Sequence, residues 1–94
     1  MSREARVRGL LTRYGDKAVW NGQTFGVHLW PVTEGAGPNK LYHCVAPASF
    51  LPYLGDTVEC LGKTYTVYKV EGEILEGERL YTTAILALCD EWGR

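Results

Sequence analysis

The 94-residue sequence lacks both a long apolar segment and a marked excess of charge of either sign. No apolar run approaches the ~18 residues of a membrane-spanning helix, and arginines are spread through the N-terminus, where a signal peptide needs an apolar block. The formal net charge is -1, whereas proteins that bind DNA or RNA usually carry a basic excess. We therefore expect a protein that is made and kept in a cytoplasm, with no reason to expect nucleic acid as its main partner.

Cysteine is also scarce, and its placement excludes two common uses. The three cysteines, Cys44, Cys60 and Cys89, are odd in number, far apart and without a C-x-x-C pair. Disulfide frameworks and structural zinc sites normally need paired cysteines. We therefore expect the three cysteines to act as small apolar side chains of a protein in a reducing compartment, and we expect no metal site.

Recognisable catalytic motifs are missing as well: the chain has no phosphate-binding loop, no G-x-G-x-x-G and no H-E-x-x-H. His43 and Cys44 are neighbours in an expected strand and so point to opposite faces, and nothing places a third, orienting group beside a Cys–His pair. Asp56 follows a glycine and is expected to form a turn. The sequence thus predicts that the protein is not an enzyme and has no catalytic residue, metal or cofactor. The polar residues weighed for a site are His28, His43, Cys44, Cys60, Cys89, Asp56 and Asp90.

What the sequence contains is typical of one globular domain spanning residues 1–94. Hydrophobic residues make up 46% and charged residues 22% of the chain, which are ordinary values for a folded protein. Ser2 can cap a helix over residues 2–14, which Gly15 would end. Apolar side chains recur along this helix at three- and four-residue intervals and are expected to pack on a sheet; they are Val7, Leu10, Leu11 and Tyr14.

Residues 17–89 combine short apolar runs with turn signals, and residues 90–94 form a tail. About six strands and the helix predict a mainly β protein, a small antiparallel β-barrel or sandwich with one N-terminal helix. Asn21-Gly22 predicts a two-residue type I′ hairpin turn that pairs Trp20 with Gln23. The expected flexible loop is residues 33–39, and further strands are expected at residues 41–46 and 80–88.

The stretch LGDTVECLGKTYTVYKVE, residues 54–71, allows a strand register to be predicted. A type II′ turn at Gly62-Lys63 places Cys60 opposite Tyr65 and Val58 opposite Val67. The apolar alternation then breaks near Val67-Tyr68, which predicts either a β-bulge or a strand long enough to bend and serve two faces. After it, residues 72–78 are expected to form an acidic loop.

Charge is distributed unevenly between the two ends of the chain. Residues 1–17 are rich in arginine, whereas residues 71–94 are rich in acidic side chains. This asymmetry would suit head-to-tail association of identical copies, but two solvated faces are the favoured explanation. The candidate interface residues are Arg3, Arg6, Arg8, Arg13, Glu73, Glu76 and Glu78.

The segment Leu54-Gly-Asp56, the strand after it, the turn at Gly62-Lys63 and the strand Tyr65–Val70 together resemble a known hairpin. It is the hairpin of small head-completion proteins, the head–tail joining or stopper proteins of long-tailed bacteriophages and prophages. Further similarity lies in residues 25–27, 41–46 and 80–88.

The resemblance implies a non-enzymatic structural protein of a phage or prophage particle, at the head–tail junction or in tail assembly. Its partners would be copies of itself in a ring, portal or connector proteins and tail proteins, with contact to packaged DNA left open and no membrane involved. It would occupy the bacterial cytoplasm during assembly and then the virion. The alternative is a small bacterial β-barrel adaptor or nucleic-acid-binding module without a virion role, because exposed rings of small barrels can stack bases.

Overall fold

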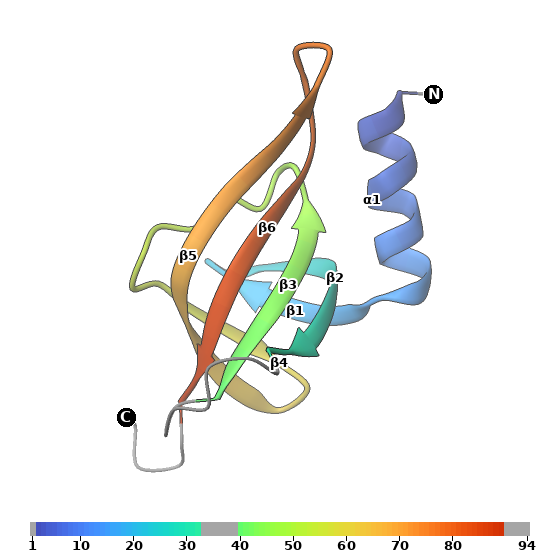
Figure 1. Ribbon diagram of the computed structural model, residues 1–94. Coiled ribbons are helices and arrows are strands. Elements are labelled where there is room, and N and C mark those ends of the chain that lie inside the picture. The colour runs from blue at the N-terminus through green and yellow to red at the C-terminus, as the bar shows by residue number, and fades with distance from the viewer. Residues whose placement is uncertain (1, 33–39, 90–94) are drawn as a thin grey trace.

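The strands of the protein close into a barrel, and a helix lies outside it (Figure 1). The computed structural model describes residues 2–32 and 40–89, so the expected loop at residues 33–39 and the tail at residues 90–94 lie outside the described part. Six strands neighbour one another in the order β1-β2-β3-β6-β5-β4, all antiparallel. This confirms the prediction of a mainly β protein with a small antiparallel barrel and an N-terminal helix. The elements are α1 (Arg3–Tyr14), β1 (Asp16–Trp20), β2 (Gln23–Pro31), β3 (Leu41–Pro47), β4 (Thr57–Cys60), β5 (Lys63–Leu75) and β6 (Glu78–Leu88).

The core fills the inside of the barrel with side chains from every strand. Alternate residues of each strand point inward, as the two-residue side-chain period requires. The segment between β3 and β4 adds Phe50, which is fully buried and packs edge-on against Trp20 and Phe25, with ring centroids 5.4 and 5.5 Å away. The core residues are Ala18, Phe25, Val27, Cys44, Ala46, Phe50, Val58, Cys60, Tyr65, Val67, Ala84 and Leu86.

The first hairpin turn follows the sequence prediction. Asn21 and Gly22 both have positive φ, 52° and 74°, as a type I′ turn requires. Trp20 is then the register partner of Gln23. The β1–β2 hairpin is therefore confirmed.

The second hairpin turn lies one residue earlier than predicted. Leu61 and Gly62 take positive φ, 55° and 75°, so a type I′ turn replaces the expected type II′ turn at Gly62-Lys63. A type I′ turn matches the right-handed twist of the strands, and here a leucine occupies the position that asparagine usually takes. The partners become Cys60 with Lys63 and Val58 with Tyr65. This register differs from the predicted one by two residues, so each side chain keeps its predicted face.

The predicted bulge in β5 is present, and the predicted acidic loop is wrong. The β5–β6 register shifts between Val67 and Lys69, which leaves Tyr68 as the extra residue. Beyond the bulge both strands continue, and Glu76-Gly77 forms a third turn with positive φ, 53° and 80°. Because this two-residue turn lets the strands pair almost to its ends, residues 72–78 form a hairpin that extends beyond the other strands (Figure 1).

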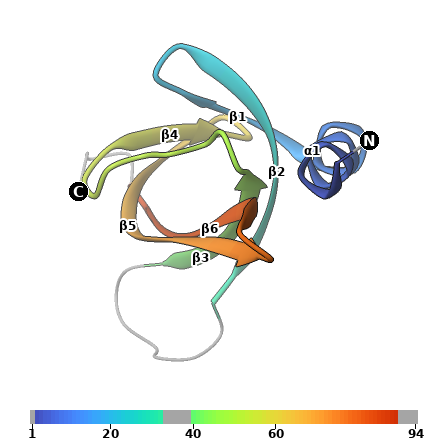
Figure 2. The same cartoon turned by 90° about the horizontal axis from the view of Figure 1, so that it is seen from above.

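The helix begins as predicted, but its apolar side is buried only in part. The Ser2 hydroxyl accepts a hydrogen bond from the Ala5 N–H at 3.1 Å. No residue of α1 is fully buried: Val7 and Leu11 are half-buried, whereas Leu10 and Tyr14 are exposed. The whole apolar stripe was expected to pack on the sheet. The helix instead lies beside β2 on the convex outside of the barrel (Figure 2), so it contacts the barrel only along a narrow line.

The contact between α1 and β2 depends on glycine. A Cβ atom at Gly26 would lie 2.7 Å from both the carbonyl carbon of Leu11 and the Cα of Thr12. The backbones of helix and strand therefore touch directly. Gly15, which ends the helix, allows a similar approach to β2: its added Cβ would clash with the carbonyl oxygen of Val27 and would lie 3.0 Å from the Val27 carbonyl carbon.

Two Gly→Ala substitutions are expected to have opposite effects on stability. Gly26→Ala should lower the free energy of unfolding by about 1–3 kcal/mol, because α1 must move away from β2. Gly9→Ala, at a helix position with nothing within 4 Å of the added Cβ, should raise it by about 0.5–1 kcal/mol. Urea denaturation followed by far-UV circular dichroism measures both. Equal effects of the two changes would contradict the backbone contact.

The turn at Leu61-Gly62 gives a second stability prediction. Leu61→Asn should raise the free energy of unfolding by about 0.5–1 kcal/mol, because asparagine tolerates the left-handed region far better than leucine. Leu61→Ala is the control, since it also removes an exposed apolar side chain but keeps an ordinary Cβ. If alanine stabilised the protein as much as asparagine in the same urea titration, the backbone conformation would not be the cause.

Candidate functional site

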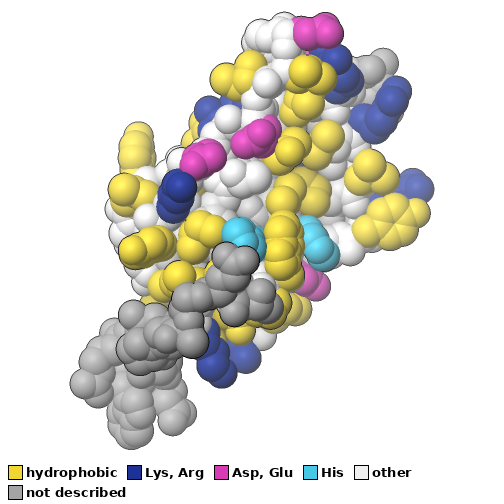
Figure 3. All heavy atoms as spheres, in the orientation of Figure 1, with side chains coloured by type: hydrophobic (Ala, Val, Ile, Leu, Met, Phe, Trp, Pro, Cys, Tyr) yellow, Lys and Arg dark blue, Asp and Glu magenta, His cyan; other side chains and the backbone are white. Residues whose placement is uncertain are grey.

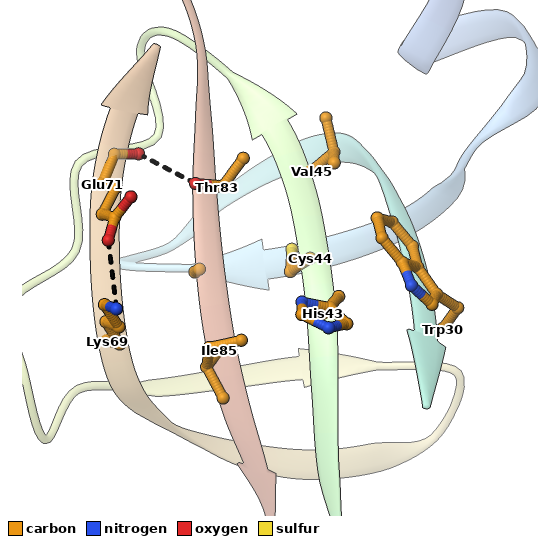
Figure 4. A pocket seen from close by; sticks show the side chains of 9 residues that line it. Trp30, His43, Cys44, Val45, Lys69, Glu71, Thr83 and Ile85 are labelled. Carbon is orange, nitrogen blue, oxygen red and sulfur yellow. Dashed lines mark hydrogen bonds and ion pairs between the residues drawn. The ribbon is translucent and has the colours of Figure 1, made fainter. Parts of the chain in front are cut away.

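A hollow of about 290 Å³ lies on the outer face of the sheet (Figure 4). β3 and β6 form its floor, with His43, Val45, Thr83 and Ile85. Trp30 of β2 stands at one side, and Lys69 and Glu71 of β5 stand at the other. The hollow is therefore bounded by an aromatic wall and a charged wall.

Trp30, the aromatic wall, belongs to a cluster of three rings: it stacks on His43 of the floor and lies tilted against His28. Trp30 is the register partner of His43, and His28 precedes it by two residues and so lies on the same face. The ring centroids are 5.0 Å apart for His28 and Trp30 and 5.2 Å apart for Trp30 and His43. Because Trp30 remains 39% exposed although two histidine rings contact it, the three rings offer partly apolar surface against which another group can pack.

The charged wall is largely neutralised within the chain. The Lys69 ammonium lies 3.1 Å from the Glu71 carboxylate, and both side chains are exposed. The Thr83 hydroxyl donates a hydrogen bond to the carbonyl oxygen of Glu71 at 3.4 Å. An exposed ion pair of this kind contributes at most about 1 kcal/mol to the stability of the fold. Breaking it in favour of contacts with another molecule therefore costs little free energy.

The structure separates His43 from Cys44, as predicted. His43 lies on the outer face, in the hollow, whereas the Cys44 side chain is 1% exposed in the core. Burial, together with the nearby thiol of Cys60, raises the pKa of the Cys44 thiol to about 12, and burial also raises the pKa of Cys60. Both groups therefore remain thiols at physiological pH, and a thiol is neither a good nucleophile nor a metal ligand.

Asp56 stabilises a turn, as predicted. Its carboxylate accepts a hydrogen bond from the Tyr53 N–H at 2.9 Å and one from the Trp20 indole N–H at 3.0 Å. Cys89 shares a hydrogen bond with the Thr66 hydroxyl at 3.1 Å, and Asp90 lies outside the described residues. Across residues 2–32 and 40–89, no three His, Cys, Asp or Glu side chains are grouped so that they could hold a metal ion.

The candidate interface residues at the two ends of the chain meet in part within one molecule. Arg3, in the first turn of α1, lies 3.3 Å from Glu76 and 3.6 Å from Glu78 on the β5–β6 hairpin. Arg8 pairs with Glu4 one helical turn away, at 3.3 Å. The oppositely charged ends thus contact each other within one chain, whereas the sequence alone suggested contacts with neighbouring copies or with solvent.

Arg6, Arg13 and Glu73 make no ion pair among the residues that the structure describes. The Arg13 guanidinium instead lies over the ring of Tyr14, 6.0 Å from its centroid. These three residues are therefore the members of the candidate set whose charge is most available to another molecule.

An exposed apolar patch beside the barrel was missed by sequence reasoning. Leu51, Tyr53 and Leu54 precede β4, and all three are exposed, as is Tyr68 at the bulge of β5. Gly55 donates a backbone hydrogen bond to Val67 at 2.9 Å, which brings Leu54 and Tyr68 together. Figure 3 shows hydrophobic side chains at this left edge of the molecule. The bulge predicted from the sequence could have indicated this patch, because the extra residue of a bulge, here Tyr68, is turned away from the core.

No family model, curated protein or solved structure matches this chain. In the part of the chain that the structure describes, α1 is too short and too polar for a transmembrane span.

The burial of the thiols gives a direct chemical prediction. In the native protein at pH 8, Cys89, which is partly exposed, should react quickly with a thiol-specific disulfide reagent, whereas Cys44 and Cys60 should react only after unfolding. Stopped-flow absorbance in buffer and in urea counts the fast and slow thiols, and Cys89→Ser should abolish the fast phase. A fast phase of more than one thiol would contradict the closed core.

Proposed function

We propose that the chain is a non-enzymatic structural protein of a phage or prophage particle, acting at the head–tail junction or in tail assembly. It assembles as a ring of identical copies and contacts portal or connector proteins and tail proteins. It occupies the bacterial cytoplasm during assembly and the virion afterwards. The hairpin that suggested this family corresponds to β4 and β5.

The proposal rests on one observation: many large apolar side chains are exposed at the surface. Such side chains are exposed in several separate places, among them α1, the patch beside β5 and the end of the β5–β6 hairpin. Exposed apolar patches on small proteins mark surfaces that bind other proteins. Several such surfaces suit a component that contacts both its own copies and other proteins.

The chemistry of the polar residues supports a structural role. Two thiols are in the core, Asp56 stabilises a turn, and the pair of Lys69 and Glu71 is self-neutralised. These groups contribute to the fold rather than converge on a common point where a reacting atom could lie. The hollow beside Trp30 suits a docking segment of a partner better than a reaction.

The alternative, a nucleic-acid-binding barrel, is favoured by one feature, the ring cluster of His28, Trp30 and His43. Base stacking on such rings is normally combined with a groove of basic residues. Here the cation of the hollow is Lys69, and Glu71 neutralises it. We therefore place this function second.

Mixing the protein with the purified cognate portal complex should add a ring of density at the connector, visible by negative-stain electron microscopy. A variant with Tyr53→Ser and Tyr68→Ser, both exposed positions, tests whether the apolar patch contributes to that binding. A connector that gains no density would refute the stopper role. Salt-dependent binding to single- or double-stranded DNA, weakened by Arg6→Glu with Arg13→Glu, would instead support the alternative.

A further inference from the structure

A second hollow, of about 370 Å³, lies between the first hairpin turn and the turn that leads into β4. We call it the Asp56 hollow; the residues that line it are Trp20, Asn21, Tyr53, Asp56 and Thr57. Two of these side chains are aromatic rings, and the other three carry oxygen atoms that can accept hydrogen bonds. The hollow thus combines ring surface with hydrogen-bond acceptors.

Asp56 is held in this hollow by two hydrogen bonds. Its Oδ2 atom accepts one from the Trp20 indole N–H at 3.0 Å and one from the Tyr53 N–H at 2.9 Å. The Asp56 N–H in turn donates to the Tyr53 carbonyl oxygen at 3.0 Å, in a turn where Gly55 has a φ of 91°. Trp20 is fixed as well, because its ring packs edge-on against Phe50 in the core. The carboxylate and the indole ring therefore have defined positions.

The turn uses only part of what the Asp56 carboxylate offers. Both hydrogen bonds go to Oδ2, and Oδ1 accepts none from the residues that the structure describes. Within residues 2–32 and 40–89, no ion pair neutralises Asp56. Because an asparagine could accept the same two hydrogen bonds, the turn does not account for the negative charge. That charge is available to a cation of another molecule.

The two rings of the hollow are also available to a cation. Among the described residues, a guanidinium lies over the ring of Tyr14 but over neither Trp20 nor Tyr53. Tyr53 is 79% exposed and lines the hollow together with the carboxylate. The faces of Trp and Tyr rings attract cations. Rings and carboxylate therefore favour the same kind of ligand.

The acceptors of the hollow favour a guanidinium over an ammonium group. A guanidinium is planar, stacks on aromatic rings and presents five N–H donors in a fixed fork. These donors match the free oxygen of Asp56 and the side-chain oxygens of Asn21 and Thr57. An ammonium is a compact, strongly hydrated charge that does not stack in this way. The ligand chemistry that fits best is that of an arginine side chain.

The surroundings of the hollow indicate that this arginine belongs to a protein. Tyr53 is part of the hollow and also of the exposed apolar patch formed with Leu51, Leu54 and Tyr68. A molecule that covers the patch needs apolar groups, and one that also fills the hollow needs a cation. Tyr, Trp and Arg side chains are enriched among the residues that dominate binding at protein interfaces.

We propose that the Asp56 hollow binds an arginine side chain of a partner protein whose surrounding surface is apolar. The guanidinium pairs with Asp56 and stacks against the ring of Tyr53. Apolar side chains on either side of the arginine cover the patch. The inference goes beyond the proposed function, because it assigns a ligand to this site and does not require the partner to be a virion protein.

A peptide titration tests the site. The probe is a short peptide with blocked ends and one arginine between two leucines, added to nitrogen-15-labelled protein. We expect saturable chemical-shift changes of the Trp20 indole N–H and the Tyr53 N–H, the two donors to Asp56. The same peptide with citrulline, which has nearly the same shape but no charge, should bind about tenfold more weakly. Equal binding of the two peptides, or no shift with either at millimolar concentrations, would overturn the proposal.

Two pairs of variants locate the bound cation. Asp56→Asn keeps an acceptor for the turn and should weaken binding of the arginine peptide about tenfold, whereas Glu59→Gln removes the same charge at an exposed position of β4 and should not. Tyr53→Leu should weaken it about threefold through the loss of a ring. Tyr68→Leu makes the same change in the patch but outside the hollow, so it should keep the preference for arginine over citrulline.

Urea denaturation shows first that each variant is folded. Tyr53→Leu, at an exposed position, decides the test if Asp56→Asn proves unstable. An arginine preference that persists in the folded variants of Asp56 and Tyr53 would overturn the proposal.

Two further ligands define the chemistry and its source. A lysine peptide that binds as tightly as the arginine peptide would overturn the assignment to a guanidinium. Blocked arginine without the leucines should bind more weakly than the peptide, because the patch then stays uncovered. Equally tight binding would indicate a small free cation and overturn the protein partner.

The peptide titration and the electron-microscopy experiment can fail independently. A connector that gains no density removes the virion role, and the site still stands if the peptide shows the arginine preference. A peptide without that preference removes the site, and a ring of density on the connector would still support the proposed function.

Discussion

The rest of the structure depends on the closure of the sheet between its first and fourth strands. β1 pairs with β4 through Ala18 with Cys60 and Val19 with Glu59. This short ladder turns a curved sheet into a barrel and removes the open edges that would otherwise pair with other chains. It is possible because Ala18 and Cys60, both small, meet inside at almost no exposure. Once the sheet is closed, Phe50 can fill the interior against Trp20 and Phe25.

Closure also explains why so much apolar surface remains outside. A closed barrel of this size has a small interior, and the helix covers only part of its exterior. The bulge at Tyr68 lets β5 leave the curvature of the barrel and continue with β6 as a hairpin. The same bend turns Tyr68 outward, beside Leu54. The surfaces that the proposed function uses are therefore consequences of how a long strand accommodates a narrow barrel.

Local signals in the sequence were sufficient for most of the elements. Asn21-Gly22 identified a turn with two positive φ values, Ser2 identified the start of the helix, and the parity change after Val67 identified the bulge. The turns at Leu61-Gly62 and Glu76-Gly77 were missed because leucine and glutamate seldom occupy positive φ. At these two places the twist of the paired strands outweighs the local preference of one residue.

The sequence by itself determined which faces of the strands are apolar, and hence the class of fold and the core, because a register error of two residues, as at the β4–β5 turn, leaves each side chain on its face. Only the tertiary structure decided which charges find partners in the chain and which apolar side chains stay in water. Arg3 meets Glu76 across 73 positions of sequence, while Arg6, Arg13 and Glu73 form no ion pair among the described residues. Tyr14 and Leu10 belong to an apolar stripe, yet the direct backbone contact at Gly26 directs Val7 and Leu11 toward the barrel instead. Such outcomes depend on distances between elements far apart in the chain, which periodicity within one element does not contain.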